Sequence, residues 1–333
     1  MNRREFMIAA ASGALSAMAG MVGDESSFAS EPLRKVTGEN ATKVALVRTP
    51  DRASGIKRAI DLLAINPVKG KEVLLKPNFN TADPFPGSTH NDTLTNLISH
   101  LKQMGATKIT IGERSGPPDT SRVLRAKDIY ELCEKLDVEI INFEKLPPGE
   151  WTRVRPGLSH WRDGFDVAKP VLDAECIVTT CCLKTHRFGG VFTMSLKLSV
   201  GITNKRNMAE LHGSHLNMRK MIAEINQVYT PSLIVLDGIE AFVDGGPAHG
   251  TKKRADVILA GTDRVAIDTV GLAILKDLGS NRAIMETKIF EQEQIARAVE
   301  LGLGVKNPKE IKIMADEEEG QEYARRLTGI LET

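Results

Sequence analysis

Cysteine is scarce in this sequence. The chain has 333 residues and four cysteines, Cys133, Cys176, Cys181 and Cys182. Four cysteines do not form a disulfide framework in a chain this long, and their spacing is not the closely repeated spacing of a ferredoxin cluster. We therefore expect no built-in iron–sulfur cluster.

An excess of charge of one sign is also missing. Lysine and arginine total 44 and aspartate and glutamate total 43, so the net charge is +1. Such a balance creates no overall field that would draw the chain to nucleic acid or to an anionic membrane. No nucleic-acid partner is expected, and a site for a small anionic molecule must be local.

The glycine signatures of nucleotide-binding proteins are missing as well. Gly189-Gly190 and the loop 245–250 could bring backbone amides close to an anion. Neither stretch matches a P-loop, and no GxGxxG motif opens a helix after the first predicted strand. The glycine pattern therefore does not favour a nucleotide site.

Long apolar runs are limited to the N-terminus. Residues 1–29 contain the pair Arg3-Arg4 and then a weakly apolar stretch. Small residues flank a possible cleavage site after Ala29. This pattern resembles a twin-arginine export signal, and an ordinary secretory signal or an uncleaved anchor are the alternatives. No later segment approaches the roughly 20 apolar residues of a membrane span, so we expect no stable span in the mature chain.

The twin-arginine export machinery is therefore an expected partner. It carries folded proteins, so the predicted location is the periplasm or another extracytoplasmic space after signal cleavage. A polar linker at 30–42 follows the predicted signal.

Short apolar runs alternate with helical patterns along the rest of the chain. Predicted strands lie at 43–48, 72–75, 108–111, 138–141, 176–180, 233–236, 257–260 and 310–314. Apolar residues at helical spacing lie between most of these strands. The alternation predicts an α/β fold with a mostly parallel sheet flanked by helices.

Prolines, glycines and both tryptophans interrupt this alternation between residues 146 and 169. The chain is long enough for one large domain or two lobes. The interruption divides it into a first α/β lobe at 43–150, a connecting segment at 151–170, a second α/β lobe at 171–315 and a C-terminal tail at 316–333.

Charged and hydrogen-bonding side chains follow the predicted strands. Ligands of open parallel sheets bind beyond the carboxyl ends of the strands, where the loops open on one rim. The rim candidates are Lys76, Asn78, Glu113, Lys184, His186, Asp237, Glu240 and Asp263. Each alone is more commonly a helix cap or a solvated turn, but several on one rim indicate a site.

Two groups of residues have the side chains of metal ligands. Cys181 and Cys182 stand near His186, and His212 and His215 could share a helical face with His186 as a third ligand. A divalent metal is therefore one candidate cofactor, with His212 as a candidate ligand. We favour buried thiols for the two cysteines and a surface position for His215.

A series of short motifs stands in a specific order. The series is KPN at Lys76, TH at Thr89 followed by Asp92, GE at Gly112, LKTH at Leu183, SLK ending at Lys197, His212, DGIEAFVDGGPAHG from Asp237 and TDRVAID from Thr262. From about Lys43 to Met314 the chain resembles the domain-of-unknown-function family 362. The resemblance implies an α/β fold and a site built from these motifs, and it brings His90, Lys197 and Gly246 into the candidate set. The family's reaction is unassigned.

Three positions depart from the family pattern. Asn91 stands where a proline often follows the histidine, Leu198 where an asparagine often follows the lysine, and Cys181 where a proline often precedes LKTH. The ferredoxin-type cysteine motifs of some relatives are absent here. Electron transfer through a built-in cluster is therefore not implied.

These candidates favour an exported enzyme that binds a small anionic or carboxylate-bearing substrate. Lysine would hold the anion, and histidine suits acid–base work because its reference pKa lies near ~6.5. The catalytic candidates are His90, His186 and Glu113. The substrate-binding candidates are Lys76, Asn78, Lys184, Lys197, Asp237, Glu240, Gly246 and Asp263. The three aspartate and glutamate residues of the second set would orient the bases or hold a metal.

Two other function classes remain open. One is a non-catalytic periplasmic protein that binds a ligand or a metal, and the other is an assembly factor for a redox enzyme. A purely structural alternative is that Lys184 and Lys197 pair with Asp237 or Glu240 and only hold loops together.

The export signal generates the first prediction. Replacing Arg3 and Arg4 together by lysine should abolish export, because twin-arginine recognition requires the paired arginines. The measurement is the amount of mature protein in the periplasm relative to the cytoplasm. Unchanged periplasmic levels would contradict the prediction.

Overall fold

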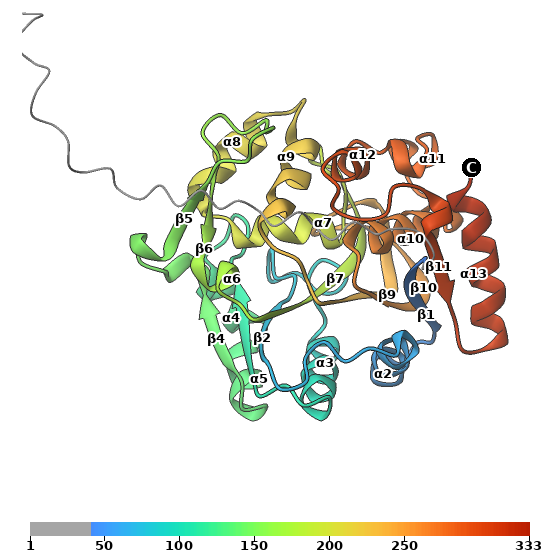
Figure 1. Cartoon of the computed structure of the whole chain (residues 1–333), viewed down its shortest axis with the longest axis horizontal. Coiled ribbons are helices and arrows are strands. Elements are labelled where there is room, and N and C mark those ends of the chain that lie inside the picture. Colours follow the sequence, from blue (N-terminus) through green and yellow to red (C-terminus); the bar gives the residue numbers. More distant parts are fainter. Residues whose placement is uncertain (1–40) are drawn as a thin grey trace, which may run out of the picture. The chain divides into compact units, whose positions relative to one another are not determined.

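A nine-stranded mixed sheet runs through residues 41–333, the part of the chain that the computed structural model describes (Figure 1). The predicted signal 1–29 and the linker up to residue 40 lie outside these residues. Eight strands follow the order β11 (Ile311–Met314), β1 (Thr42–Arg48), β10 (Gly250–Gly261), β9 (Leu233–Gly245), β7 (Cys176–His186), β2 (Glu72–Lys76), β3 (Lys108–Glu113) and β4 (Glu139–Asn142). The ninth, β8 (Val191–Thr193), pairs with the end of β7.

The sheet is mostly parallel, as predicted. Strands β9, β7, β2, β3 and β4 form one parallel block, and β1 pairs in parallel with β11. Strand β10 is antiparallel to both of its neighbours, β1 and β9. Strands β5 (Trp151–Val154) and β6 (Phe165–Ala168) form a separate antiparallel pair.

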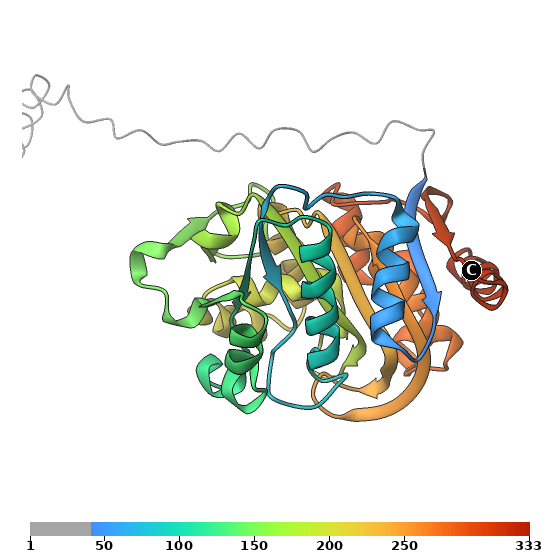
Figure 2. The same cartoon turned by 90° about the horizontal axis from the view of Figure 1, so that it is seen from below.

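Helices cover both faces of the sheet. On one face α2 (Arg52–Leu63), α3 (Asn91–Gln103) and α5 (Ile129–Lys135) bury their apolar sides against β1, β2 and β3, and Figure 2 shows α2 and α3 side by side in front of the strands. α4 (Thr120–Ala126) precedes α5. Alternate strand residues point to opposite faces, so each buried strand supplies two apolar layers.

The other face carries α10 (Arg264–Asp277), whose residues are buried over most of its length. It packs between the sheet and the helices α12 (Glu293–Glu300) and α13 (Glu318–Leu331). A helix enclosed on all sides is apolar over most of its surface, which explains why Asp268 and Thr269 are the only polar residues in the VAIDTVGLAIL run. The segment predicted as a C-terminal tail thus contains a packed helix.

The same face also carries α7 (Ser195–Leu198) and α9 (Met218–Ile225). The remaining short helices are α6 (Lys169–Leu172), α8 (Met208–Gly213) and α11 (Arg282–Met285). No helix within residues 41–333 is long and apolar enough to cross a membrane.

Strand β7 is longer than the sequence predicts. We expected it to end at Thr180, but it continues through Lys184 to His186. Lys184 pairs with Phe242 of β9 on one side and with Thr193 of β8 on the other. Strands β8 and β9 pair with this part of β7 and so extend it. Its polar side chains therefore lie in a strand, although a prediction from apolar runs alone places them in a loop.

The strands of the two predicted lobes lie in one sheet. Strand β1 lies between β10 and β11, and β2 lies beside β7. Strand β1, from the N-terminal part of the chain, thus lies in the same half of the sheet as β9, β10 and β11, which come from the C-terminal part. Within residues 41–333 the chain clusters as one unit.

Gly246 holds the loop after β9 against β7 and generates the second prediction. Its φ is +64°, and an added Cβ would overlap the carbonyl oxygen of Thr185. Gly246→Ala should therefore lower the free energy of unfolding by at least about 1–3 kcal/mol, a typical cost of a strained backbone. Chemical denaturation monitored by circular dichroism measures this change.

Gly329→Ala is the matched control for this substitution. Gly329 lies inside α13, and nothing stands within 4 Å of its added Cβ. The control should be neutral or stabilising by up to about 1 kcal/mol, because alanine favours a helix over glycine. Equal effects of the two substitutions would contradict the assigned role of Gly246.

Candidate functional site

A small cavity lies where β2, β3 and β7 bring their polar side chains together. About 40 Å³ of it is open to the centres of water molecules, which is room for about three waters. Its charged and amide side chains include Lys76, Asn78, Glu113, Arg114, Lys184 and Lys197. Four of these six are predicted rim residues and Lys197 is a candidate from the family resemblance, and the structure brings them together.

Lys76 and Glu113 form the floor of this cavity. Each is the last residue of its strand, and their charged groups lie 2.5 Å apart, almost completely buried. Glu113 also accepts hydrogen bonds from the backbone amides of Phe79 and Arg114, at 2.8 Å each. Burial raises the pKa of Glu113 and lowers that of Lys76, and their contact opposes both shifts.

Gly201 closes over the Lys76–Glu113 pair. An added Cβ at this glycine would stand 2.8 Å from the Lys76 Nζ and 3.2 Å from a Glu113 carboxylate oxygen. A side chain at this position would displace the Lys76 ammonium group, so glycine favours the close approach of this backbone to the ion pair.

Lys184 contributes a second ammonium group, which is fully buried. It donates to the Asn78 side-chain oxygen at 2.8 Å and to the Gly87 carbonyl oxygen at 2.5 Å. Both acceptors are neutral, and within residues 41–333 it has no carboxylate partner. Burial lowers its pKa. A buried cation without a counter-charge is costly, so this lysine has the character of a functional group.

Arg114 adds a third cation at the cavity wall. Its guanidinium donates to the carbonyl oxygens of Thr203, at 2.7 Å, and of Val200. Burial lowers the pKa of Arg114 to about 10. The arginine therefore fixes the backbone that follows α7 and keeps its own charge next to the cavity.

Lys197 extends from α7 toward His186. The Lys197 Nζ lies 3.0 Å from the His186 Nε2, while the backbone amide of Gly190 donates to the Nδ1 at 3.3 Å. An acceptor Nδ1 carries no proton, so the neutral ring carries its proton on Nε2. The Nε2 proton then points at the Lys197 Nζ. This nitrogen can accept the hydrogen bond only when it is a neutral amine.

The electrostatics of this contact favour the same protonation states. Burial, Lys197 and Lys184 together lower the pKa of His186 to about 2. Burial, Lys184 and Arg114 lower the pKa of Lys197 to about 7. At neutral pH the imidazole is therefore neutral, and about half of the Lys197 side chains are free amines.

Asp268 anchors the short helix that carries Lys197. Its two carboxylate oxygens accept the backbone amides of Ser195, at 2.7 Å, and Leu196, at 2.9 Å. These are the first amides of α7, which have no partner inside the helix. Burial raises the pKa of Asp268 to about 7. This aspartate therefore sets the position of Lys197 without lining the cavity.

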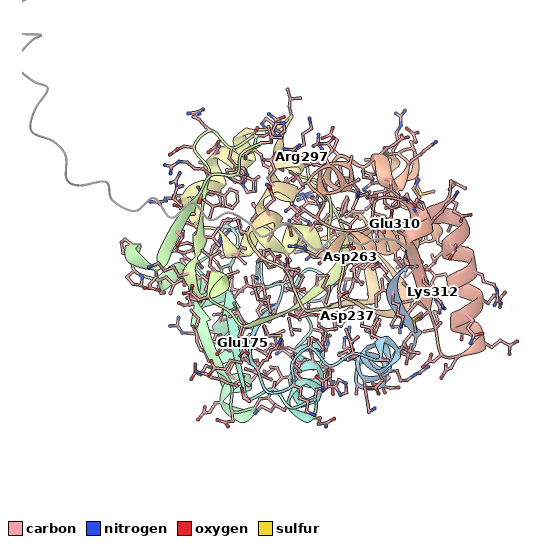
Figure 3. All side chains as sticks on the ribbon, viewed as in Figure 1. Glu175, Asp237, Asp263, Arg297, Glu310 and Lys312 are labelled. Atoms are coloured by element: carbon pink, nitrogen blue, oxygen red, sulfur yellow. The ribbon has the colours of Figure 1, made fainter. Side chains whose placement is uncertain are left out.

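The three predicted acidic rim residues lie elsewhere. Asp237 is buried against Arg52 at 2.8 Å, Glu240 contacts Lys252 at 3.4 Å, and Asp263 caps α10 by accepting the Ala266 amide. Asp237 lies in β9 and Asp263 at the start of α10, and Figure 3 labels both. None of the three lines the cavity, and none pairs with Lys184 or Lys197.

His90, His212 and Gly246 are also outside the cavity wall. His90 caps α3 by accepting the Asp92 amide, and burial and then Arg52 lower its pKa. His212 is exposed, with its Nδ1 2.8 Å from the Met208 carbonyl oxygen. Gly246 packs on β7, and the residue after it, Pro247, reaches the cavity.

The cysteines are free and buried, as predicted for Cys181 and Cys182. Burial raises the pKa of Cys182 to about 11 and raises that of Cys181 as well. Within residues 41–333, no three side chains of histidine, cysteine, aspartate or glutamate lie close enough together to hold a metal ion.

Sequence reasoning assigned no role to several residues of the site. Arg114 appears in the sequence only as a rim residue after Glu113, and Asp268 only as the last letter of TDRVAID. Thr193 lines the cavity with a buried hydroxyl that has no hydrogen-bond partner among the described residues. The charge of Arg114 and the family motif around Asp268 were the features of the sequence from which these two residues could have been found.

Two known proteins are similar to this chain. The chain is 26% identical over 252 residues to the thylakoid-associated protein sll1697 of Synechocystis sp. (strain ATCC 27184 / PCC 6803 / Kazusa), covering 73% of this chain and 75% of that protein. The lactate racemase apoprotein from Thermoanaerobacterium thermosaccharolyticum aligns with a TM-score of 0.45 at 12% identity, covering 87% of this chain and 86% of that one.

The family described as domain of unknown function (DUF362) matches residues 73–273. This span is more than half of the chain, and it contains every residue that lines the cavity. The order of motifs in the sequence indicated the same family. The chain therefore belongs to the DUF362 family.

Proposed function

We propose that this protein is an enzyme that binds a small carboxylate-bearing or similar oxyanionic substrate in the cavity and transfers a proton through Lys197. The observation that carries the proposal is the charge of the cavity wall. Lys76, Lys184, Lys197 and Arg114 surround a space in which Glu113 is the single carboxylate among the described residues.

The excess of positive charge supports an anionic ligand. Glu113 is engaged with Lys76, so it does not neutralise Lys184 or Arg114. Removing two or more cations from water is unfavourable unless a counter-charge is supplied. A bound oxyanion supplies that charge and also accepts the remaining N–H group of Lys184.

Lys197 is the group best suited to proton transfer. A side chain whose pKa lies near the working pH can both take and give a proton, and the pKa of Lys197 is about 7. His186 was one of the two histidines expected as acid or base, but its pKa of about 2 leaves it neutral. We assign His186 the positioning of the Lys197 amine instead.

The proposal includes an extracytoplasmic location. It rests on Arg3-Arg4 and the weakly apolar stretch that follows them. A folded enzyme carried across the membrane would meet its substrate in the periplasm.

Anion binding generates the third prediction. Oxalate, a small dicarboxylate, should bind the purified protein, and Lys184→Met should weaken that binding about ten- to a hundredfold. A charge-assisted hydrogen bond contributes roughly 1.5–3 kcal/mol, and 1.4 kcal/mol is a factor of ten in affinity. Isothermal titration calorimetry measures the dissociation constants.

Lys205→Met is the matched control. Lys205 is a partly buried lysine that pairs with Glu144 and does not line the cavity. Its replacement should leave the oxalate affinity within about twofold, because it removes the same charge from another place. A large drop in melting temperature of Lys184→Met, with unchanged affinity in the folded fraction, would contradict the proposal and favour a structural lysine.

A further inference from the structure

Lys197 differs from the other cations of the cavity in its hydrogen bonds. Lys76, Lys184 and Arg114 each donate to oxygen acceptors. The only hydrogen-bond partner of the Lys197 Nζ within the described residues is the His186 ring nitrogen. Since that nitrogen carries the ring proton, the lysine is arranged as an acceptor, which is the arrangement of a neutral amine.

The surrounding backbone holds this amine in place. Asp268 fixes the first amides of α7, and Arg114 fixes the carbonyl groups that follow the helix. Gly190 packs against the pair formed by Lys197 and His186. A Cβ added at Gly190 would stand 2.9 Å from the His186 Nδ1 and 3.1 Å from the Lys197 Cε. The amine is thus preorganised at the cavity wall, as a covalent catalyst requires.

We propose that Lys197 is a nucleophile that forms an imine with the carbonyl carbon of a small 2-oxo acid, whose carboxylate lies against Lys184. This inference rests on the anion site of the proposed function and names its substrate class. It assigns the Lys197 amine an attack on the carbonyl carbon, where the proposed function assigns it proton transfer. The carboxylate occupies the cationic part of the cavity, and the adjacent carbonyl group then faces the amine.

The covalent step is balanced without an oxidant or a reductant. The Nζ lone pair leaves its hydrogen bond with the His186 Nε2–H and forms a bond to the carbonyl carbon, and the π electrons of the carbonyl group move to its oxygen. A proton passes from nitrogen to oxygen and gives a carbinolamine. The nitrogen lone pair then expels this oxygen, which takes one further proton from solvent and leaves as water. One amine, one carbonyl group and one proton become one protonated imine and one water.

The size of the cavity limits the substrate. With about 40 Å³ open to water-sized groups, it suits glyoxylate or pyruvate. A 2-oxo acid with a phenyl ring, such as phenylpyruvate, requires several times more space. The site therefore selects 2-oxo acids with a short chain.

Reductive trapping tests the inference and is the fourth prediction. The full chain is incubated at pH 7 with glyoxylate and sodium cyanoborohydride, which reduces an imine to a stable secondary amine, and mass spectrometry locates the modified lysines. At this pH about half of Lys197 is an amine, whereas a surface lysine of pKa ≈ 10.4 is an amine in about one molecule in 10³. Modification of Lys197 should exceed that of an exposed lysine such as Lys306 by about 10²- to 10³-fold.

Three controls accompany the trapping. Oxalate should protect Lys197 from modification, and phenylpyruvate should give no preference for it. Lys197→Arg cannot form the imine, so the preferred modification should disappear and should not move to Lys76 or Lys184. His186→Leu removes the proton donated to the amine, so the pH midpoint of trapping should move upward from about 7 toward that of a surface lysine.

The outcomes separate this inference from the proposed function. If oxalate binds in a Lys184-dependent way but glyoxylate modifies Lys197 no faster than the exposed Lys306, the imine is wrong and the anion site stands. If oxalate does not bind and Lys197 shows no preference, both proposals fail. Preferential, oxalate-protected modification of Lys197 supports both.

Discussion

The buried ammonium group of Lys184 donates to two neutral oxygens and to no carboxylate of the described chain, and the rest of the site depends on this imbalance. In a low-dielectric interior, each additional cation raises the cost of the others. Lys184 is one of the groups that lower the pKa of Lys197 to about 7, and it also lowers that of His186. The same charge that would attract an oxyanion therefore also keeps Lys197 available as an amine.

The fold places these groups with few elements. Parallel strands β2 and β3 end in Lys76 and Glu113, while β7 continues past them to bring Lys184 and His186 alongside the loops of its neighbours. The short helix α7 then returns over this edge, held by the buried carboxylate of Asp268. Ligand sites beyond the carboxyl ends of parallel strands are the rule for open α/β sheets, and this cavity follows that rule.

The sequence predicted the fold class and most of the charged side chains of the cavity wall, because strand ends can be recognised where an apolar run meets a charged residue. Lys76, Asn78 and Glu113 were found in this way. The sequence did not predict the features that contacts between distant parts of the chain determine. Asp237 follows an apolar run just as Glu113 does, yet it pairs with Arg52, 185 residues away in the chain. The length of β7 and the anchoring role of Asp268 also depend on neighbours that no local pattern reveals.

The most direct test of the central claim is a crystal structure of the protein with oxalate. We expect the oxalate dianion inside the cavity, with one carboxylate within hydrogen-bond distance of the Lys184 Nζ and the other directed toward Lys197. The Lys76–Glu113 pair should remain intact beneath it. Oxalate absent from the cavity at a concentration that saturates binding in solution, or bound only at surface lysines, would contradict the account.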